Sequence, residues 1–205
     1  ASQSGAIQTG IIPDAATCTD CLQDINNPQN RRTDYAFTNC THCGPRLSIV
    51  RQIPYDRVHT SMQPFDLCDN CQQEYNDPGN RRFHAQPNAC PDCGPFLRIL
   101  DAKGTAIHSD NILASAATLI QQGHILAIKG IGGFQLACDA SNDEAVRLLR
   151  QRKKRPSKAL ALMASSLEQI TQYCEVSTEE RLLLQSSAAP IVVLAILGST
   201  QSLSP

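Results

Sequence analysis

The chain has 205 residues, of which 41% are hydrophobic and 18% are charged, and its formal net charge is −1. This composition supports a folded core and excludes a chain that is disordered throughout. The near-zero charge argues against a surface built as a whole for nucleic acid, so any basic site is local. No run of about 18 apolar residues is present, so we expect no membrane-spanning helix and no membrane partner. Residues 1–10 lack the charged and apolar regions of a signal peptide, and we expect none.

Eight of the ten cysteines form four C-x2-C pairs, while Cys138 and Cys174 stand alone. Such pairs aim two thiolates at one tetrahedral zinc ion, so we favour metal over disulfides, and with it a reducing, cytoplasmic location. Four sulfurs around each ion leave no position for water, so the expected role of two Zn2+ ions is structural. The predicted ligands are Cys18, Cys21, Cys40, Cys43, Cys68, Cys71, Cys90 and Cys93.

The first half of the chain repeats itself with a period of 50 residues. Each copy reads C-x2-C, eighteen intervening residues, C-x2-C and then Gly-Pro. The repeat predicts one small zinc-finger-like unit used twice, at residues 18–50 and 68–100, with a linker at residues 51–67. Such a unit is too small to fold by burial alone, and a four-thiolate zinc site supplies about 10–16 kcal/mol of apparent binding free energy. The pairs could combine within each repeat or interleave between the repeats.

An arginine pair also recurs in both copies, as Arg31-Arg32 and Arg81-Arg82. These side chains could contact phosphate, or they could be solvated and paired with nearby aspartates and glutamates. We favour the second interpretation, because arginine side chains are mostly exposed in folded proteins.

Helices and strands alternate in the second half, which predicts an α/β domain over residues 108–205. We expect Asp110 to cap its first helix and Gly123 to end it. The expected helices are 110–122, a stretch after a capping box of Ser141 and Glu144, 166–173 and 178–186 with a Ser177–Glu180 box; the expected strands are 124–129, 159–163 and 191–197. The chain ends soon after the last of these strands, so we expect a truncated domain.

Two segments of this half carry residue types that bind phosphate. Lys129-Gly130-Ile131-Gly132-Gly133 follows the first strand, and its glycines would let backbone amides approach an anion, although its spacing matches no standard phosphate loop. Six cations within residues 150–158 lie at a helix C-terminus, where the helix dipole favours positive charge. The two segments are either a strand-exit turn and a solvated helix end, or two parts of one polyphosphate site.

From Ile12 to about Leu194 the chain closely resembles the HypF family of carbamoyltransferases, which act in hydrogenase maturation. The resemblance rests on FTNCTHCGPR and RRFHAQPNACPDCGP, followed by AIKGIGGFQLACDA, LRQRKKRPSKALALM and APIVVL. It implies that residues 1–17 link to a missing N-terminal domain. It also implies that the second half is the first part of a YrdC-like domain, a fold shared with threonylcarbamoyl-adenylate synthases. The chain departs from the usual family pattern at Gln135 and Ala159, where His and Pro are usual.

The resemblance also implies an activity. Family members convert carbamoyl phosphate to carbamate, activate it with ATP and Mg2+ as carbamoyl-adenylate, and transfer the carbamoyl group to the C-terminal cysteine of HypE, for the cyanide ligands of the nickel–iron centre. No catalytic residue is identified. The residues implied for the carbamate and phosphate pocket are Lys129, Gly130, Gly132 and Gly133, and those implied for the ATP phosphates are Lys153, Arg155 and Lys158.

Two other functions are compatible with parts of the sequence. A threonylcarbamoyl-adenylate synthase that acts for tRNA would share the α/β fold, but the zinc repeats argue against it. A non-catalytic zinc module could bind protein or nucleic acid. Recognition of RNA uses stacked aromatic side chains, and only 4% of the residues are aromatic, so nucleic acid is the less favoured partner.

Overall fold

The structure is a computed structural model that describes residues 10–198 and 203–204. Its described residues form two compact units, one of residues 10–96 with 186–189 and one of residues 97–185 with 190–198 and 203–204. The predicted fold class, a tandem zinc-finger-like repeat followed by a small α/β domain, is confirmed. Among the described residues, every helix is too short or too polar to span a bilayer.

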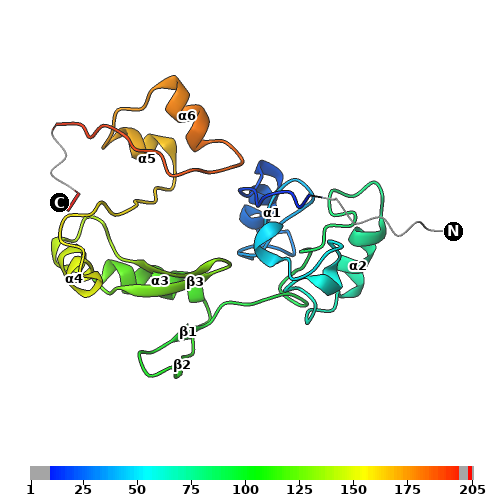
Figure 1. The fold of residues 1–205 in the computed structure, drawn as a ribbon. Helices are drawn as coiled ribbons and strands as arrows, with labels where there is room; N and C mark the ends of the chain where they lie inside the picture. Colours follow the sequence, from blue (N-terminus) through cyan, green and yellow to red (C-terminus); the bar gives the residue numbers. More distant parts are fainter. Residues whose placement is uncertain (1–9, 199–202, 205) are drawn as a thin grey trace. The chain divides into compact units, whose positions relative to one another are not determined.

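The first unit contains the same short helix twice, α1 (Thr19–Asn26) and α2 (Asp69–Asn76) (Figure 1). Each helix begins directly after the first cysteine of its repeat. Cys18 and Cys68 therefore occupy the N-cap positions, and neither side chain makes a capping hydrogen bond, which leaves both sulfurs available for metal. The second cysteine of the first C-x2-C pair in each repeat, Cys21 or Cys71, is buried in the first turn of the helix.

The two repeats share one hydrophobic core and are not separate domains. Tyr35 and Ile49 of the first repeat pack with Met62 of the linker and Ala89 of the second repeat. The linker also holds a 3-10 helix, η2 (Arg57–His59), and a second one, η1 (Leu47–Ile49), ends the first repeat. Asp14 accepts hydrogen bonds from the backbone N–H groups of residues 46 and 48, so the stretch before Cys18 also packs onto the first repeat.

A glycine follows the last cysteine of each repeat, and both are held in close quarters. Gly44 has a φ of +87°, and a Cβ there would lie 2.6 Å from the Cβ of Asn39. A Cβ at Gly94 would lie 2.5 Å from the Cβ of Ala89 and 3.1 Å from the carbonyl oxygen of Cys90. Both positions therefore require glycine for packing.

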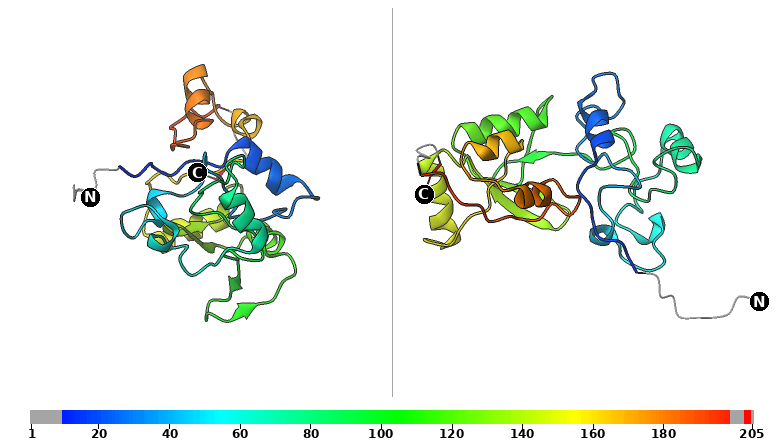
Figure 2. Two further views of the ribbon diagram at one scale, coloured as in Figure 1. Left: turned by 90° about the vertical axis from the view of Figure 1, so that its right-hand side faces the viewer. Right: turned by 90° about the horizontal axis from the view of Figure 1, so that it is seen from above.

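In its described residues, the second unit contains two antiparallel strand pairs and four helices (Figures 1 and 2). Helix α3 packs on strand β3. In chain order the elements are β1 (Ile99–Leu100), β2 (Ala106–Ile107), α3 (Ile112–Gln121), β3 (Leu126–Gly130), β4 (Gly133–Ala137), α4 (Asp143–Lys153), α5 (Leu167–Thr171) and α6 (Thr178–Leu184). Strand β1 pairs with β2, and β3 pairs with β4 from Leu126 opposite Ala137 to Gly130 opposite Gly133.

The predicted helices are present, but two of their caps were misassigned. Asn111, and not Asp110, accepts the capping hydrogen bond of α3, and Asn142, and not Ser141, caps α4. The hydroxyl of Ser141 instead donates to Asp139. Asparagine competes well with aspartate and serine as an N-cap, so neighbouring candidates are hard to separate by sequence. The end of α3 at Gly123, with a φ of +83°, and the capping box of Ser177 and Glu180 at α6 are confirmed.

The strand predictions for 159–163 and 191–197 are wrong. The first segment has no strand pairing among the described residues, and the second makes only the isolated bridge between Ile196 and Cys174. Ile191 and Val193 are 83% and 91% exposed. Apolar runs indicate a preference for burial, but a strand also needs an extended stretch of neighbouring backbone, and among the described residues the segment 191–197 pairs only briefly, with residues 173–175. Strand β4 was not predicted, and the Gly130–Gly133 segment is the turn of a β-hairpin instead of a strand-to-helix loop.

Candidate metal centres and phosphate-binding segments

The eight paired cysteines gather into two groups of four, each within one repeat. The sulfur atoms of each group all lie within 4.8 Å of one another. The structure therefore has the pairing within repeats and not the interleaved one. The two groups are Cys18, Cys21, Cys40 and Cys43, and Cys68, Cys71, Cys90 and Cys93.

The sulfur spacing matches a tetrahedral zinc site. In the first group, the sulfur of Cys40 lies 3.7 Å from that of Cys18 and 3.8 Å from that of Cys43. The second group repeats these distances around Cys90, at 3.7 Å to Cys68 and 3.8 Å to Cys93. Four sulfurs at the usual zinc–sulfur distance of about 2.3 Å are roughly 3.8 Å apart, whereas a disulfide needs about 2.05 Å. Both groups fit Zn2+ and neither fits a disulfide.

The electrostatics of the first group also favour a cation. The hydrogen bond with Cys21 lowers the pKa of Cys43 to about 4, and the same bond raises the pKa of Cys21 far above that of a free thiol. In a buried cluster, one thiol thus ionises at the expense of its neighbour. A bound divalent cation removes this competition, because all four sulfurs can then be thiolates.

An arginine–carboxylate network surrounds the cysteine groups, and the sequence did not reveal its extent. Arg32 is only 2% exposed and pairs with Glu74 of the other repeat at 2.6 Å. Burial alone would raise the pKa of Glu74, but hydrogen bonds from Arg32 and Arg31 outweigh it and lower the pKa to about 2. The expectation of solvated arginines is therefore wrong for this pair, although the expected acidic partners exist. A signal was present, because Asp24 and Glu74 recur at the same 50-residue period as the arginines.

The glycine segment forms the exposed end of the β3–β4 hairpin. Lys129 and Phe134 face each other across the two strands, and the Lys129 ammonium lies 5.8 Å from the centre of the Phe134 ring. Gly133 has a φ of +132°, which favours glycine at that turn position. Gly132 has open space around its Cα. The backbone at this turn is therefore accessible to a ligand.

The basic segment is shaped by the end of α4. Lys154 adopts a left-handed conformation with a φ of 51°, and the Arg155 N–H donates to the carbonyl oxygen of Arg150. The Arg150 guanidinium in turn donates to the carbonyl oxygen of Lys158 at 2.9 Å. These bonds set the path of residues 154–158 and leave the Lys153, Arg155 and Lys158 side chains exposed.

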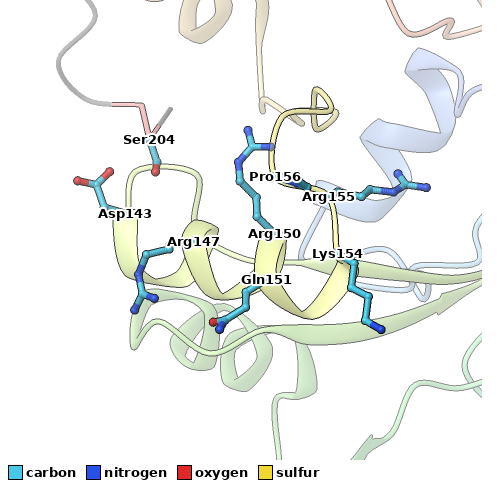
Figure 3. A pocket seen from close by; sticks show the side chains of 8 residues that line it. All are labelled: Asp143, Arg147, Arg150, Gln151, Lys154, Arg155, Pro156 and Ser204. Atoms are coloured by element: carbon cyan, nitrogen blue, oxygen red, sulfur yellow. The ribbon is translucent and has the colours of Figure 1, made fainter.

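A hollow of about 600 Å³ lies along α4 and the turn that follows it (Figure 3). Figure 3 shows Arg147 and Lys154 extending from one side of α4 and Arg150 from the other. Of the residues predicted for phosphate, only Arg155 lines this hollow. The shared polyphosphate site stays a prediction. The lining residues are Asp143, Arg147, Arg150, Gln151, Lys154, Arg155, Pro156 and Ser204.

Two family models match the chain. The HypF finger family matches residues 17–50 and 67–100. The Sua5/YciO/YrdC family, described as Telomere recombination, matches residues 118–204. The first match covers both cysteine groups, and the second covers the basic segment and the glycine hairpin.

Carbamoyltransferases named HypF are similar to nearly the whole chain. The HypF of Rhodobacter capsulatus is 52% identical over 199 residues, which are 97% of this chain and 26% of that protein. The HypF of Synechocystis sp. is 54% identical over 94% of this chain and 25% of its own length. The chain thus spans about a quarter of the length of these relatives. A shorter similarity, 39% over 66 residues, links it to the threonylcarbamoyl-AMP synthase of Vibrio campbellii.

Solved structures agree with the sequence relatives. The crystal structure of full-length HypF in a phosphate- and nucleotide-bound form superposes with a TM-score of 0.86 at 46% identity, over 95% of this chain and 26% of that one. The crystal structure of T. kodakarensis HypF gives a TM-score of 0.90, also at 46% identity, over 95% of this chain and 25% of that one.

Proposed function

Since this chain belongs to the carbamoyltransferase HypF family, we propose that it is the zinc and nucleotide-binding section of an enzyme that makes carbamoyl-adenylate. Water first converts carbamoyl phosphate to carbamate and phosphate. A carbamate oxygen then attacks the α-phosphorus of ATP, and pyrophosphate leaves. The C-terminal thiol of a HypE-type maturation protein takes the carbamoyl group and releases AMP, on the way to the cyanide ligands of a nickel–iron hydrogenase.

One observation carries this proposal: similarity to HypF extends over 97% of the chain and includes both cysteine groups. The nucleotide- and phosphate-bound state named for a HypF relative supports the same chemistry. The two tetrathiolate sites take no part in the reaction. They hold structural zinc that folds the first unit.

The basic residues have a specific part in this reaction. Attack on the α-phosphorus builds negative charge on the phosphate oxygens, and fixed cations stabilise that charge. We assign this role to Lys153, Arg155 and Lys158, with Arg155 able to hold two oxygens at once. Lys129 and the backbone amides of Gly130, Gly132 and Gly133 are assigned to the pocket for carbamate and phosphate. Mg2+ bound with ATP supplies further positive charge at the phosphates.

A threonylcarbamoyl-AMP synthase is the second candidate, favoured by the match to the Vibrio campbellii enzyme. That match covers 31% of the chain, whereas the HypF relative covers 97%. Both reactions adenylate a carbamate-type oxygen and release pyrophosphate. They differ in whether the nitrogen of the carbamate comes from carbamoyl phosphate or from threonine.

Pyrophosphate release from ATP by the zinc-loaded full-length protein separates the two candidates. We expect turnover with carbamoyl phosphate and none with threonine plus bicarbonate; the opposite pattern would assign the chain to the tRNA-modifying reaction. Lys153→Ala or Arg155→Ala should lower the rate by about 100-fold, because each removes a charge at the reacting phosphate. Lys103→Ala, in the exposed turn between β1 and β2, is the matched control and should leave the rate unchanged.

A further inference from the structure

In each repeat an arginine side chain donates a hydrogen bond to the backbone of the other repeat, and the two contacts are equivalent. The Arg32 guanidinium donates to the Ala89 carbonyl oxygen at 2.9 Å, and the Arg82 guanidinium donates to the Asn39 carbonyl oxygen at 3.0 Å. Residues 39 and 89 occupy the same place in the two repeats. Each arginine pair thus crosses to the repeat that does not contain it, and there it reaches the chain beside a metal ligand.

The carboxylates that pair with these arginines also occupy equivalent positions in the two repeats. Arg31 and Arg32 pair with Glu74 on α2, at 2.7 and 2.6 Å. Arg81 and Arg82 pair with Asp24 on α1. Each carboxylate lies three residues after the second cysteine of its repeat. It therefore holds an arginine of the other repeat next to the cysteine group.

These contacts are not symmetric at the sulfur atoms. Arg31 donates to the sulfur of Cys71 at 3.3 Å, and Arg32 donates to the same sulfur at 3.6 Å. In the described part of the chain, Arg81 donates to the Asp20 carbonyl oxygen and to carboxylates, and to no sulfur. Direct guanidinium–sulfur hydrogen bonds therefore serve the second cysteine group and come from the first repeat.

The negative charge of a four-thiolate zinc site is the reason that these hydrogen bonds affect metal affinity. Four thiolates and one Zn2+ carry a net charge of −2, and Cys71 is fully buried. A buried excess of negative charge requires compensation by hydrogen-bond donors or cations. Partners of this kind orient the ligand atoms, and their loss typically costs 10–100-fold in metal affinity.

We propose that Arg31 and Arg32 are positioning residues for the metal site of the second repeat, so that the two zinc sites load cooperatively. Zinc in the first site folds the repeat that presents these arginines to Cys71. Binding at one site therefore strengthens binding at the other, and thermodynamic linkage requires the effect to be equal in both directions. The two sites form one metal-dependent unit and not two independent fingers.

Zinc release to a chromogenic chelator, measured on the full-length protein, tests the role of Arg31. Arg31→Ala should release one of the two zinc ions about 10–100-fold faster. Arg81→Ala is the matched control, because Arg81 has the same place in the other repeat and a similar side-chain exposure, 23% against 29%, but donates no hydrogen bond to sulfur in the described part of the chain. Arg31→Lys keeps the charge and should restore part of the retention. Equal release from the Arg31→Ala and Arg81→Ala variants would overturn the proposal.

Cobalt substitution gives a readout that a general loss of stability does not move. With Co2+ in both sites, Arg31→Ala should shift the sulfur-to-cobalt charge-transfer absorption, because the thiolate of Cys71 loses hydrogen bonds. Arg81→Ala should leave this absorption unchanged. A shift in both variants, or in neither, would contradict a specific role at Cys71.

Cooperative loading can be measured on the unaltered protein, so the test does not depend on a variant that folds. Metal-free protein is titrated with zinc and the species are counted by native mass spectrometry. Independent equal sites would leave roughly half of the molecules with one zinc at half-saturation. We expect clearly fewer, with metal-free and two-zinc molecules dominating. A statistical population of one-zinc molecules would overturn the coupling.

Discussion

Gly94 shows at the scale of one residue how tightly the second cysteine knuckle packs against the first repeat. A methyl group there would lie 2.5 Å from the Cβ of Ala89 and would also clash with the hydroxyl of Tyr35. Gly94→Ala should therefore destabilise the zinc-loaded protein by about 1–3 kcal/mol, because a well-packed site cannot take an added carbon. Chemical denaturation measures the change. Gly79→Ala, where the nearest atom is a side-chain oxygen of the exposed Asp77 at 3.3 Å, should cost less than about 0.5 kcal/mol, and equal losses would contradict the packing argument.

Glu74 is the carboxylate on which the arginines of the first repeat converge. Its pairs with Arg31 and Arg32 measure 2.7 and 2.6 Å, and the Arg32 side chain is only 2% exposed. Glu74→Ala leaves a buried cation without its partner and should lower the free energy of unfolding by about 3 kcal/mol. The control is Glu144→Ala, which breaks an exposed pair with Arg147 and should change stability by about 0.5 kcal/mol or less. A similar small effect for Glu74→Ala would show that the pair is solvated.

At the scale of an element, helix α6 depends on its capping box and so on pH. Hydrogen bonds from the Ser177 backbone and side chain lower the pKa of Glu180 below its ordinary value. A lowered pKa means that the contribution to helix stability is complete above the ordinary pKa of about 4.3 and is lost as the pH falls through the lowered value. The protection factors of the α6 amides, which compare their exchange with the intrinsic rate at each pH, should fall over that acidic range. In Glu180→Gln the exchange should show no such acidic transition, and an unchanged transition would assign it to another group.

The elements also show which parts of the fold a sequence can predict. The Ser177–Glu180 box predicted the start of α6 correctly, because this signal is local to the helix. The strands at 159–163 and 191–197 failed because pairing depends on a distant backbone, about which an apolar run says nothing. The hairpin partner β4 was missed because its turn, Ile131-Gly132, lies inside a segment interpreted as a ligand loop.

The metal groups were predictable to the residue, and their surroundings were not. The C-x2-C spacing identifies eight ligands, because two cysteines three apart in one turn point at one ion. The choice between pairing within repeats and between them could not be made, since both repeats have identical spacing. The path of Arg32 to Glu74 spans 42 residues, and no local pattern predicts such a contact.

At the scale of the whole molecule, metal removal should affect the two compact units differently. The first unit has a small core around Tyr35, Ile49, Met62 and Ala89, so we expect it to unfold when a chelator removes zinc. Hydrogen–deuterium exchange of the full-length protein should show lost protection in α1 and α2, with α3 and α4 unchanged. Re-addition of zinc should restore it. Retained protection in α1 and α2 would mean that burial alone holds the repeats together.

The proposed reaction is tested most directly at its last acceptor, the C-terminal thiol of a HypE-type protein. The measurement is the intact mass of that protein after incubation with full-length enzyme, ATP and carbamoyl phosphate. We predict the addition of one carbamoyl group at the C-terminal cysteine, dependent on both small molecules and strongly reduced with the Arg155→Ala enzyme. Carbamoylation without ATP, or an unmodified thiol while the enzyme makes threonylcarbamoyl-adenylate, would contradict the account.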